Sequence, residues 1–199
     1  MEVSVFAVLL LGMLGILTTF LIRGQRFSQQ TESYGYAQRE ATKIIRTLTD
    51  DLYRSTHRHI RSASGQIVFL SSRPLEGGTD VAIEFDPGTG QTTWKSWTSY
   101  SYDEETRRVL RSRVPLTPAT SGLDDPPEPE VAFGDFVSLG TEQKVVGNAV
   151  ESFRVSREGL EIFTVEVSTR FLGTSKKNAT GSRSAEVSLS STVRLLDQE

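Results

Sequence analysis

The pattern of hydrophobic and polar positions divides the chain into three parts, and the first is apolar. From Val3 to Ile22 no charged residue occurs, and Ser4, Thr18 and Thr19 are mild polar interruptions. About twenty helical residues reach roughly 30 Å, the hydrocarbon thickness of a bilayer. The pattern therefore predicts a transmembrane helix over residues 1–23, with a cleaved secretory signal peptide as the alternative.

A helical period follows this run. From Tyr34 onward apolar residues recur every three or four positions, and no proline occurs before Pro74. This spacing predicts an amphipathic continuation over residues 24–64, with the helix itself reaching about Ser55. The expected polar face comprises Arg39, Glu40, Lys43, Arg46, Asp50, Asp51 and Arg54. The apolar stripe has to pack on something further along the chain.

The remaining residues, 65–199, have the pattern of a β-rich head. Segments rich in β-branched and aromatic residues are bounded by turn residues; they read QIVFL, VAIEF, QTTWKSWTSYSYD, RVLRSRV, ESFRVS, LEIFTVEVSTRFL and SAEVSLSSTVRLL. We expect a mostly antiparallel sheet with one face on the helix and the other largely solvated. Residues 115–130 and 173–184 are expected to be loops. The predicted fold class is α+β, with one long N-terminal helix packed on this head.

Aromatic residues alternate with polar ones between Thr93 and Tyr102. Strict alternation puts Trp94 on the same face as Tyr100, and Trp97 on the opposite face. Such a face could hold a ligand or stack single-stranded nucleic acid. It is also what a strand packed on a helix shows, and that interpretation is preferred here.

Composition excludes several kinds of chemistry. The net charge of −3 gives no basic surface for nonspecific nucleic-acid binding, so no nucleic-acid partner is expected. Without cysteine there is no disulfide, thiolate metal site or cysteine nucleophile. No motif of a serine hydrolase, zinc protease or nucleotide-binding loop occurs, so neither catalysis nor a cofactor is expected.

Two clusters have side chains that could bind a metal ion. His57 and His59 are two positions apart, which on a helix points them away from each other, so a solvated helix end is preferred. The acidic loop offers oxygen ligands that calcium can use, from Asp124, Asp125 and Glu128. It lacks the regular spacing of an EF-hand loop, so these residues remain weak calcium candidates in an exposed loop.

The opening MEVSVFAVLLLGMLGIL resembles the N-terminus of type IV pilins and type II secretion pseudopilins, beginning at the last two positions of their pattern, Met1 and Glu2. Later segments are similar, in the same order, to those of the larger minor pseudopilins; they are TLTDDLYRS, YSYDEETRRVLRS, VVGNAVESFRVS and VSLSSTVRLL. The proline that is frequent in the apolar helix of that family is missing here.

The resemblance implies a structural subunit of a short filament, which performs no catalysis. Glu2 would pair with the N-terminal amine of a neighbouring subunit and so set the register of assembly. Among the apolar residues, Gly12, Gly15 and Thr19 would let a neighbouring helix approach closely. The implied partners are sister pilin or pseudopilin subunits, the inner membrane, and a prepilin peptidase acting on a leader upstream of Met1.

The implied location is the inner membrane, crossed once, with the head in the periplasm or extracytoplasmic space. Two other functions are compatible with the sequence. One is a single-pass, membrane-anchored binding module whose sheet recognises a ligand or secreted substrate. The other is a membrane-tethered hydrolase, which would depend on His57 and His59.

Overall fold

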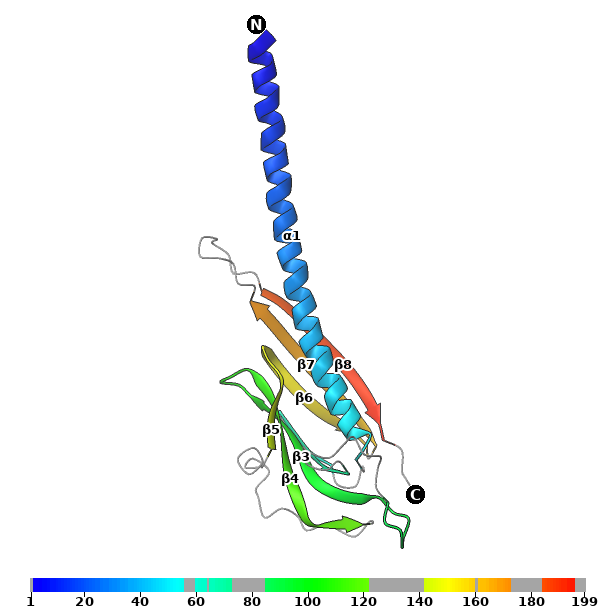
Figure 1. The fold of residues 1–199 in the computed structure, drawn as a ribbon. Coiled ribbons are helices and arrows are strands. Elements are labelled where there is room, and N and C mark those ends of the chain that lie inside the picture. The colour runs from blue at the N-terminus through cyan, green and yellow to red at the C-terminus, as the bar shows by residue number, and fades with distance from the viewer. Residues whose placement is uncertain are drawn as a thin grey trace.

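The computed structural model describes residues 2–55, 60–63, 65–72, 85–121, 142–159, 161–172 and 184–195. Within them one helix, α1 (Glu2–Leu52), precedes eight strands: β1 (Arg61–Ala63), β2 (Gln66–Ser71), β3 (Thr93–Asp103), β4 (Arg108–Ser121), β5 (Glu142–Gly147), β6 (Val150–Glu158), β7 (Ile162–Leu172) and β8 (Ser184–Arg194). Figure 1 shows α1 extending far beyond the strands, with the N-terminus at its free end. The prediction of an α+β fold with one N-terminal helix and antiparallel strands is confirmed.

The helix is a single unbroken element of 51 residues, about 75 Å long. Its end is closed by short-range hydrogen bonds, from Arg54 N to Asp51 O (3.2 Å) and from Ser55 N to Leu52 O (2.9 Å). Such bonds between residues three apart tighten a last turn and end a helix. The sequence had assigned residues up to 64 to the helical part, but Arg61–Ala63 form the short strand β1.

The prediction of a membrane span is wrong. In the part of the chain that the structure describes, no helix is long and apolar enough to cross a membrane, so the inner-membrane, single-pass location is corrected as well. The prediction counted uncharged residues from Val3 onward. Among the described residues, Arg23 and Arg26 follow the apolar stretch and add charge at its C-terminal side.

The strands form two antiparallel sheets, where the sequence had predicted one. The larger has the order β1-β2-β3-β4-β5, and the smaller has the order β6-β7-β8. Successive residues of β2 face opposite sides, and both sides are buried. Ile67 and Phe69 join the main core with Tyr100, whereas Val68 and Leu70 pack with Trp97 on the far side. The larger sheet is therefore buried on both faces rather than solvated on one.

A β-bulge corrects the predicted facing of the tryptophans. The pairing of β3 with β4 shifts register between Trp94, which pairs with Thr120, and Ser96, which pairs with Pro115, so β4 has three more residues than β3 between these two pairs. Trp94 consequently shares the far face with Trp97 instead of lying on the side of Tyr100. All three aromatic side chains are buried, which confirms the interpretation of these residues as core.

Part of the predicted proline-rich loop is strand. β4 continues to Ser121 through Pro115 and Pro118, and Pro115 pairs with Ser96. On the other side of β4, β5 pairs only with residues 109–113. Beyond that point β4 has a free edge in the described residues, where a proline removes no ladder hydrogen bond.

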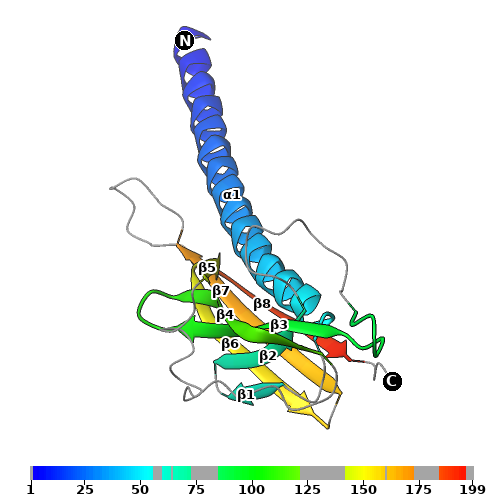
Figure 2. The same cartoon turned by 60° about the horizontal axis from the view of Figure 1, so that its bottom comes forward.

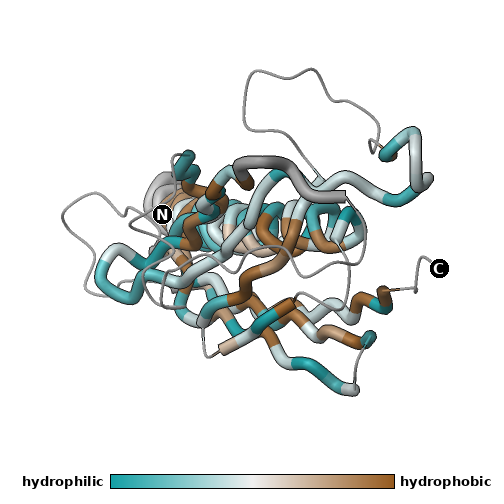
Figure 3. Tube along the Cα trace, turned by 90° about the horizontal axis from the view of Figure 1, so that it is seen from below, coloured by the Kyte–Doolittle hydropathy of each residue, from teal (hydrophilic) through white to brown (hydrophobic). Residues whose placement is uncertain are grey.

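The helix packs on the smaller sheet, over β7 and β8, and also touches β5 and β2. Figure 2 shows the two sheets crossing, with the C-terminal part of α1 beside both of them. Along the strands, hydrophobic and polar segments follow each other (Figure 3). The main core therefore lies where α1 and the two sheets meet.

Candidate interaction helix and its buried anchor

The C-terminal half of α1 is held on the head by a narrow stripe. The side chains buried along it recur every three or four residues: Ser33, Ala37, Ala41, Ile44, Leu48, Asp51 and Leu52. This is the spacing of one helical face, so the predicted amphipathic stripe is confirmed from Ala37 onward. Phe27 and Tyr34, which continue the same period, are exposed.

Small residues let α1 lie close to the strands. Thr169 Oγ1 on β7 donates a buried hydrogen bond of 2.7 Å to the carbonyl oxygen of Ala37. A Cβ atom built on Gly147 would come within 2.3 Å of Ile44 Cδ1, so only glycine fits there without rearrangement. Next to it, Asn148 N donates to Glu40 Oε2 at 3.0 Å. These contacts fasten the helix to both sheets.

The N-terminal half of α1 has no such cover. Every described side chain from Phe6 to Glu32 is exposed, and large apolar side chains dominate as far as Ile22. They occupy all sides of the helix: Phe6, Leu9, Leu10, Leu11, Met13, Leu14, Ile16, Leu17, Phe20, Leu21 and Ile22. A helix that is hydrophobic all round is normally buried in an apolar environment. We call residues 6–22 the interaction helix.

The predicted packing residues lie within the interaction helix. A Cβ atom added at Gly12 or Gly15 would meet nothing within 4 Å, so this side of the helix is open. Thr19 Oγ1 donates to the carbonyl oxygen of Gly15 at 2.8 Å, and Thr18 makes the same kind of bond to Leu14. Both hydroxyl groups therefore have a partner in the helix itself, which makes them compatible with an apolar contact.

The other predicted site residues lie outside what is described. This holds for the side chain of Glu2, for both histidines, and for the calcium candidates Asp124, Asp125 and Glu128. Among the residues that the structure does describe, no group of three or more His, Cys, Asp or Glu side chains could hold a metal ion. The predictions for the undescribed residues stay predictions.

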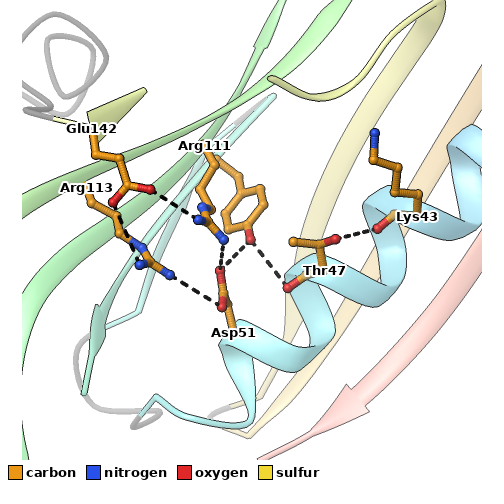
Figure 4. A network of polar contacts seen from close by, with 7 residues as sticks. Lys43, Thr47, Asp51, Arg111, Arg113 and Glu142 are labelled. Carbon is orange, nitrogen blue, oxygen red and sulfur yellow. Dashed lines mark hydrogen bonds and ion pairs between the residues drawn. The ribbon is translucent and has the colours of Figure 1, made fainter. Parts of the chain in front are cut away.

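A buried ionic cluster anchors the last turn of α1. Asp51, which the sequence had placed on the polar face, is fully buried, and its Oδ2 accepts a 2.6 Å hydrogen bond from Tyr100 Oη. Arg111 Nη1 lies 3.4 Å from Asp51 Oδ2, and Arg113 Nη2 lies 3.8 Å from Oδ1. Glu142 on β5 contacts the same two guanidinium groups at 3.4 Å and 3.9 Å. Figure 4 shows the cluster joining α1, β4 and β5.

The cluster has two positive and two negative charges, so it is balanced. Buried ions are tolerated when each one is paired and hydrogen-bonded. Burial first, and then the negative charge of Asp51, raises the pKa of Tyr100 well above its ordinary value, so the phenol remains a hydrogen-bond donor. The geometry is that of a structural anchor that connects the end of the helix to the sheet.

Sequence reasoning missed this cluster, although two signals were present. Asp51 lies seven residues after Ile44, which is two helical turns and hence the same face. On β4, Arg111 and Arg113 alternate in register with the fully buried Val109. Alternation in a strand places all three residues on one face, so the two arginine side chains share the core-facing side of Val109.

No protein-family model, no curated protein and no solved structure matches the chain.

Proposed function

We propose that the protein is a structural subunit that assembles through the interaction helix with sister subunits into a filament. This proposal rests mainly on one observation: the helix is apolar on every side over residues 6–22, and each of its described side chains there is exposed. The resemblance of the opening to pilins and minor pseudopilins supports the same function. It also favours a minor subunit at the tip of a short type II secretion or pilus-like filament.

The energetics favour helix-to-helix burial. Fully burying one side chain of the size of leucine or phenylalanine contributes about 1.5–3 kcal/mol. Association costs roughly 4–15 kcal/mol in translational and rotational freedom. The interaction helix exposes eleven such side chains, and burial of all of them would contribute more than that cost. The head alone offers no comparable described surface, because its large apolar side chains are mostly buried.

The shape of α1 suits a filament. Its covered half holds the head, and its free half projects beyond the strands, so neighbouring helices can reach it from several directions (Figure 1). Gly12, Gly15 and Thr19 are separated by three and four residues and so share one side of the helix. Small residues on one side allow two helix backbones to approach closely.

A photo-crosslinking experiment in the native cell tests this function. A photoreactive phenylalanine analogue replaces Phe20 in the interaction helix, or Phe85 on the head as the matched control. Both side chains are exposed, by 79% and 58%. We expect Phe20 to capture copies of this chain or other chains that begin with a similar apolar helix. Capture of a partner from Phe85 but not from Phe20 would contradict the proposal and favour a binding module.

A further inference from the structure

The strands at the edges of the two sheets are not equally protected. β1 has three residues, and β5 has six, carries Lys144 and pairs across a register shift. β6 also has a register shift, between Val150 and Ser152, and contacts β1 and β2. Short length, lysine, bulges and covering elements are the usual means of preventing edge-to-edge pairing.

β8 has no lysine, proline or bulge, and α1 packs over its face rather than pairing with its edge. It is an edge of 11 residues, SAEVSLSSTVR, without proline or lysine, and it pairs with β7 from end to end without a register shift. Within the described residues no strand pairs with its other side. In Figure 1, β8 lies on the outer side of the sheet that α1 covers. The structure thus presents a long, regular strand edge.

We propose that β8 pairs with β8 of a second copy of this chain, antiparallel and centred on Ser190. In this register the sequence is complementary to itself. Glu186, near one end, lies opposite Arg194 of the second copy, near the other end, and this happens twice by symmetry. Opposite charges directly across an antiparallel pair stabilise it.

The core side of the strand matches in the same register. Val187 lies opposite Val193 of the second copy, and both side chains are buried on the side of α1. Ser188 lies opposite Thr192 on the exposed side. A shift by one residue would place exposed positions opposite buried ones, which a sheet with one covered face does not allow. A shift by two residues keeps the faces but separates Glu186 from Arg194.

The contacts within each copy leave room for this pairing. Arg194 donates from Nε to Glu161 Oε2 at 3.4 Å, and a guanidinium group carries five N–H donors, so a second carboxylate can be bound. Glu186 accepts a hydrogen bond from Ser168 at 3.1 Å. Its carboxylate has two oxygens and can accept further bonds.

The pairing goes beyond the proposed function and does not rest on it. A two-fold contact uses the same surface on both copies and closes on itself, whereas a filament repeats a head-to-tail contact in one direction. The two copies of α1 would run in opposite directions over a combined six-stranded sheet. The dimer is therefore a state distinct from the filament. In the dimer the two α1 helices point in opposite directions, whereas subunits of a filament all point the same way.

Cysteine cross-linking of the full chain tests the pairing, and the chain has no native cysteine to interfere. Ser190→Cys places two thiols opposite each other at the two-fold axis, about 4.5–5.5 Å apart between Cα atoms, within the range for a disulfide. We expect a covalent dimer of two 22.0 kDa chains under mild oxidation.

Ser188→Cys and Thr192→Cys are the matched controls on the same exposed side. In the proposed register each of these residues lies about 13 Å from its own counterpart, too far for a disulfide. Neither variant should cross-link alone, but a mixture of the two should. If Ser190→Cys cross-links no faster than Ser188→Cys, the pairing is wrong.

Charge exchange gives an independent test in the Ser190→Cys background. Glu186→Arg should abolish the cross-link, because two arginines then face each other. Adding Arg194→Glu should restore it by re-forming both pairs with reversed sign. A double variant that folds, as judged by circular dichroism, but does not regain the cross-link would overturn the proposed register.

Discussion

Tyr100 Oη lies 2.6 Å from Asp51 Oδ2, which connects the middle of β3 to the last turn of α1. The two residues are 49 positions apart, so the contact exists only in the folded head. Asp51 has no exposed surface, and two arginines surround it. The carboxylate of Asp51 is therefore the shared partner of Tyr100, Arg111 and Arg113.

Asp51→Asn should destabilise the protein strongly. Removing one partner of a buried ion pair leaves the remaining charges uncompensated, which costs about 3–5 kcal/mol. The measurement is urea unfolding followed by circular dichroism. Asp50→Asn is the control, because Asp50 is largely exposed and its 4.0 Å contact with Arg46 is a surface pair worth less than about 1 kcal/mol. Equal losses from both variants would show that the cluster does not act as an anchor.

Alkaline pH should weaken the contribution of Tyr100. Its pKa is raised in the folded protein by burial and by the charge of Asp51, so folding favours the neutral phenol. That contribution is fully present below the unfolded pKa of about 10 and is lost as the pH rises through the folded pKa. The difference in unfolding free energy between wild type and Tyr100→Phe should shrink above about pH 10. A difference that stays constant up to pH 11 or so would argue against this linkage.

Gly147→Ala should destabilise the contact between α1 and β5. The added Cβ would lie 2.3 Å from Ile44 Cδ1, and overpacking of this kind costs about 1–3 kcal/mol. Shortening the opposing side chain with Ile44→Val should recover part of the loss. Gly35→Ala is the matched control: nothing lies within 4 Å of its Cβ, and alanine in a helix is favoured by up to about 1 kcal/mol. The two glycine variants should shift the thermal midpoint in opposite directions.

Glu2→Ala should reduce incorporation into the proposed filament while leaving the head folded. The reason is the expected pairing of this carboxylate with the N-terminal amine of a neighbouring subunit, which would be buried on assembly. Glu32→Ala is the control on the same helix, since Glu32 is exposed. Incorporation is measured as the fraction of the chain recovered with sheared filaments. Unchanged recovery of the Glu2 variant would exclude the pairing.

Most of the secondary structure could be predicted from the local pattern of hydrophobic and polar residues. The helical stripe through Ala41, Ile44 and Leu48 and most of the strands were predicted, because period and turn residues are properties of neighbouring positions. A tight turn separates the segments predicted as VAIEF and QTTWKSWTSYSYD: Gly90 N donates to Asp86 O at 2.7 Å, and Phe85 pairs with Thr92.

What the pattern missed depends on contacts between distant residues. The bulge that moves Trp94 to the far face is a mismatch between β3 and β4, and neither strand shows it alone. Pro115 is tolerated in β4 because, within the described residues, β5 pairs with β4 only as far as Arg113. Asp51 on α1 is acceptable in the core because Arg111 and Arg113 on β4 balance its charge. Each case requires knowledge of the partner before the residue can be interpreted.

The continuous helix also gives the molecule a mechanical direction. A pull along the axis of α1 would load its attachments side by side, from Ala37 with Thr169 to Asp51 with Tyr100. These points are separated by about 20 Å of helix, so they share the force in shear rather than yield one after another. A pull across the axis would instead peel the helix from its N-terminal side, starting at Ser33 and reaching the ionic cluster last. The head should therefore resist axial tension far better than lateral force.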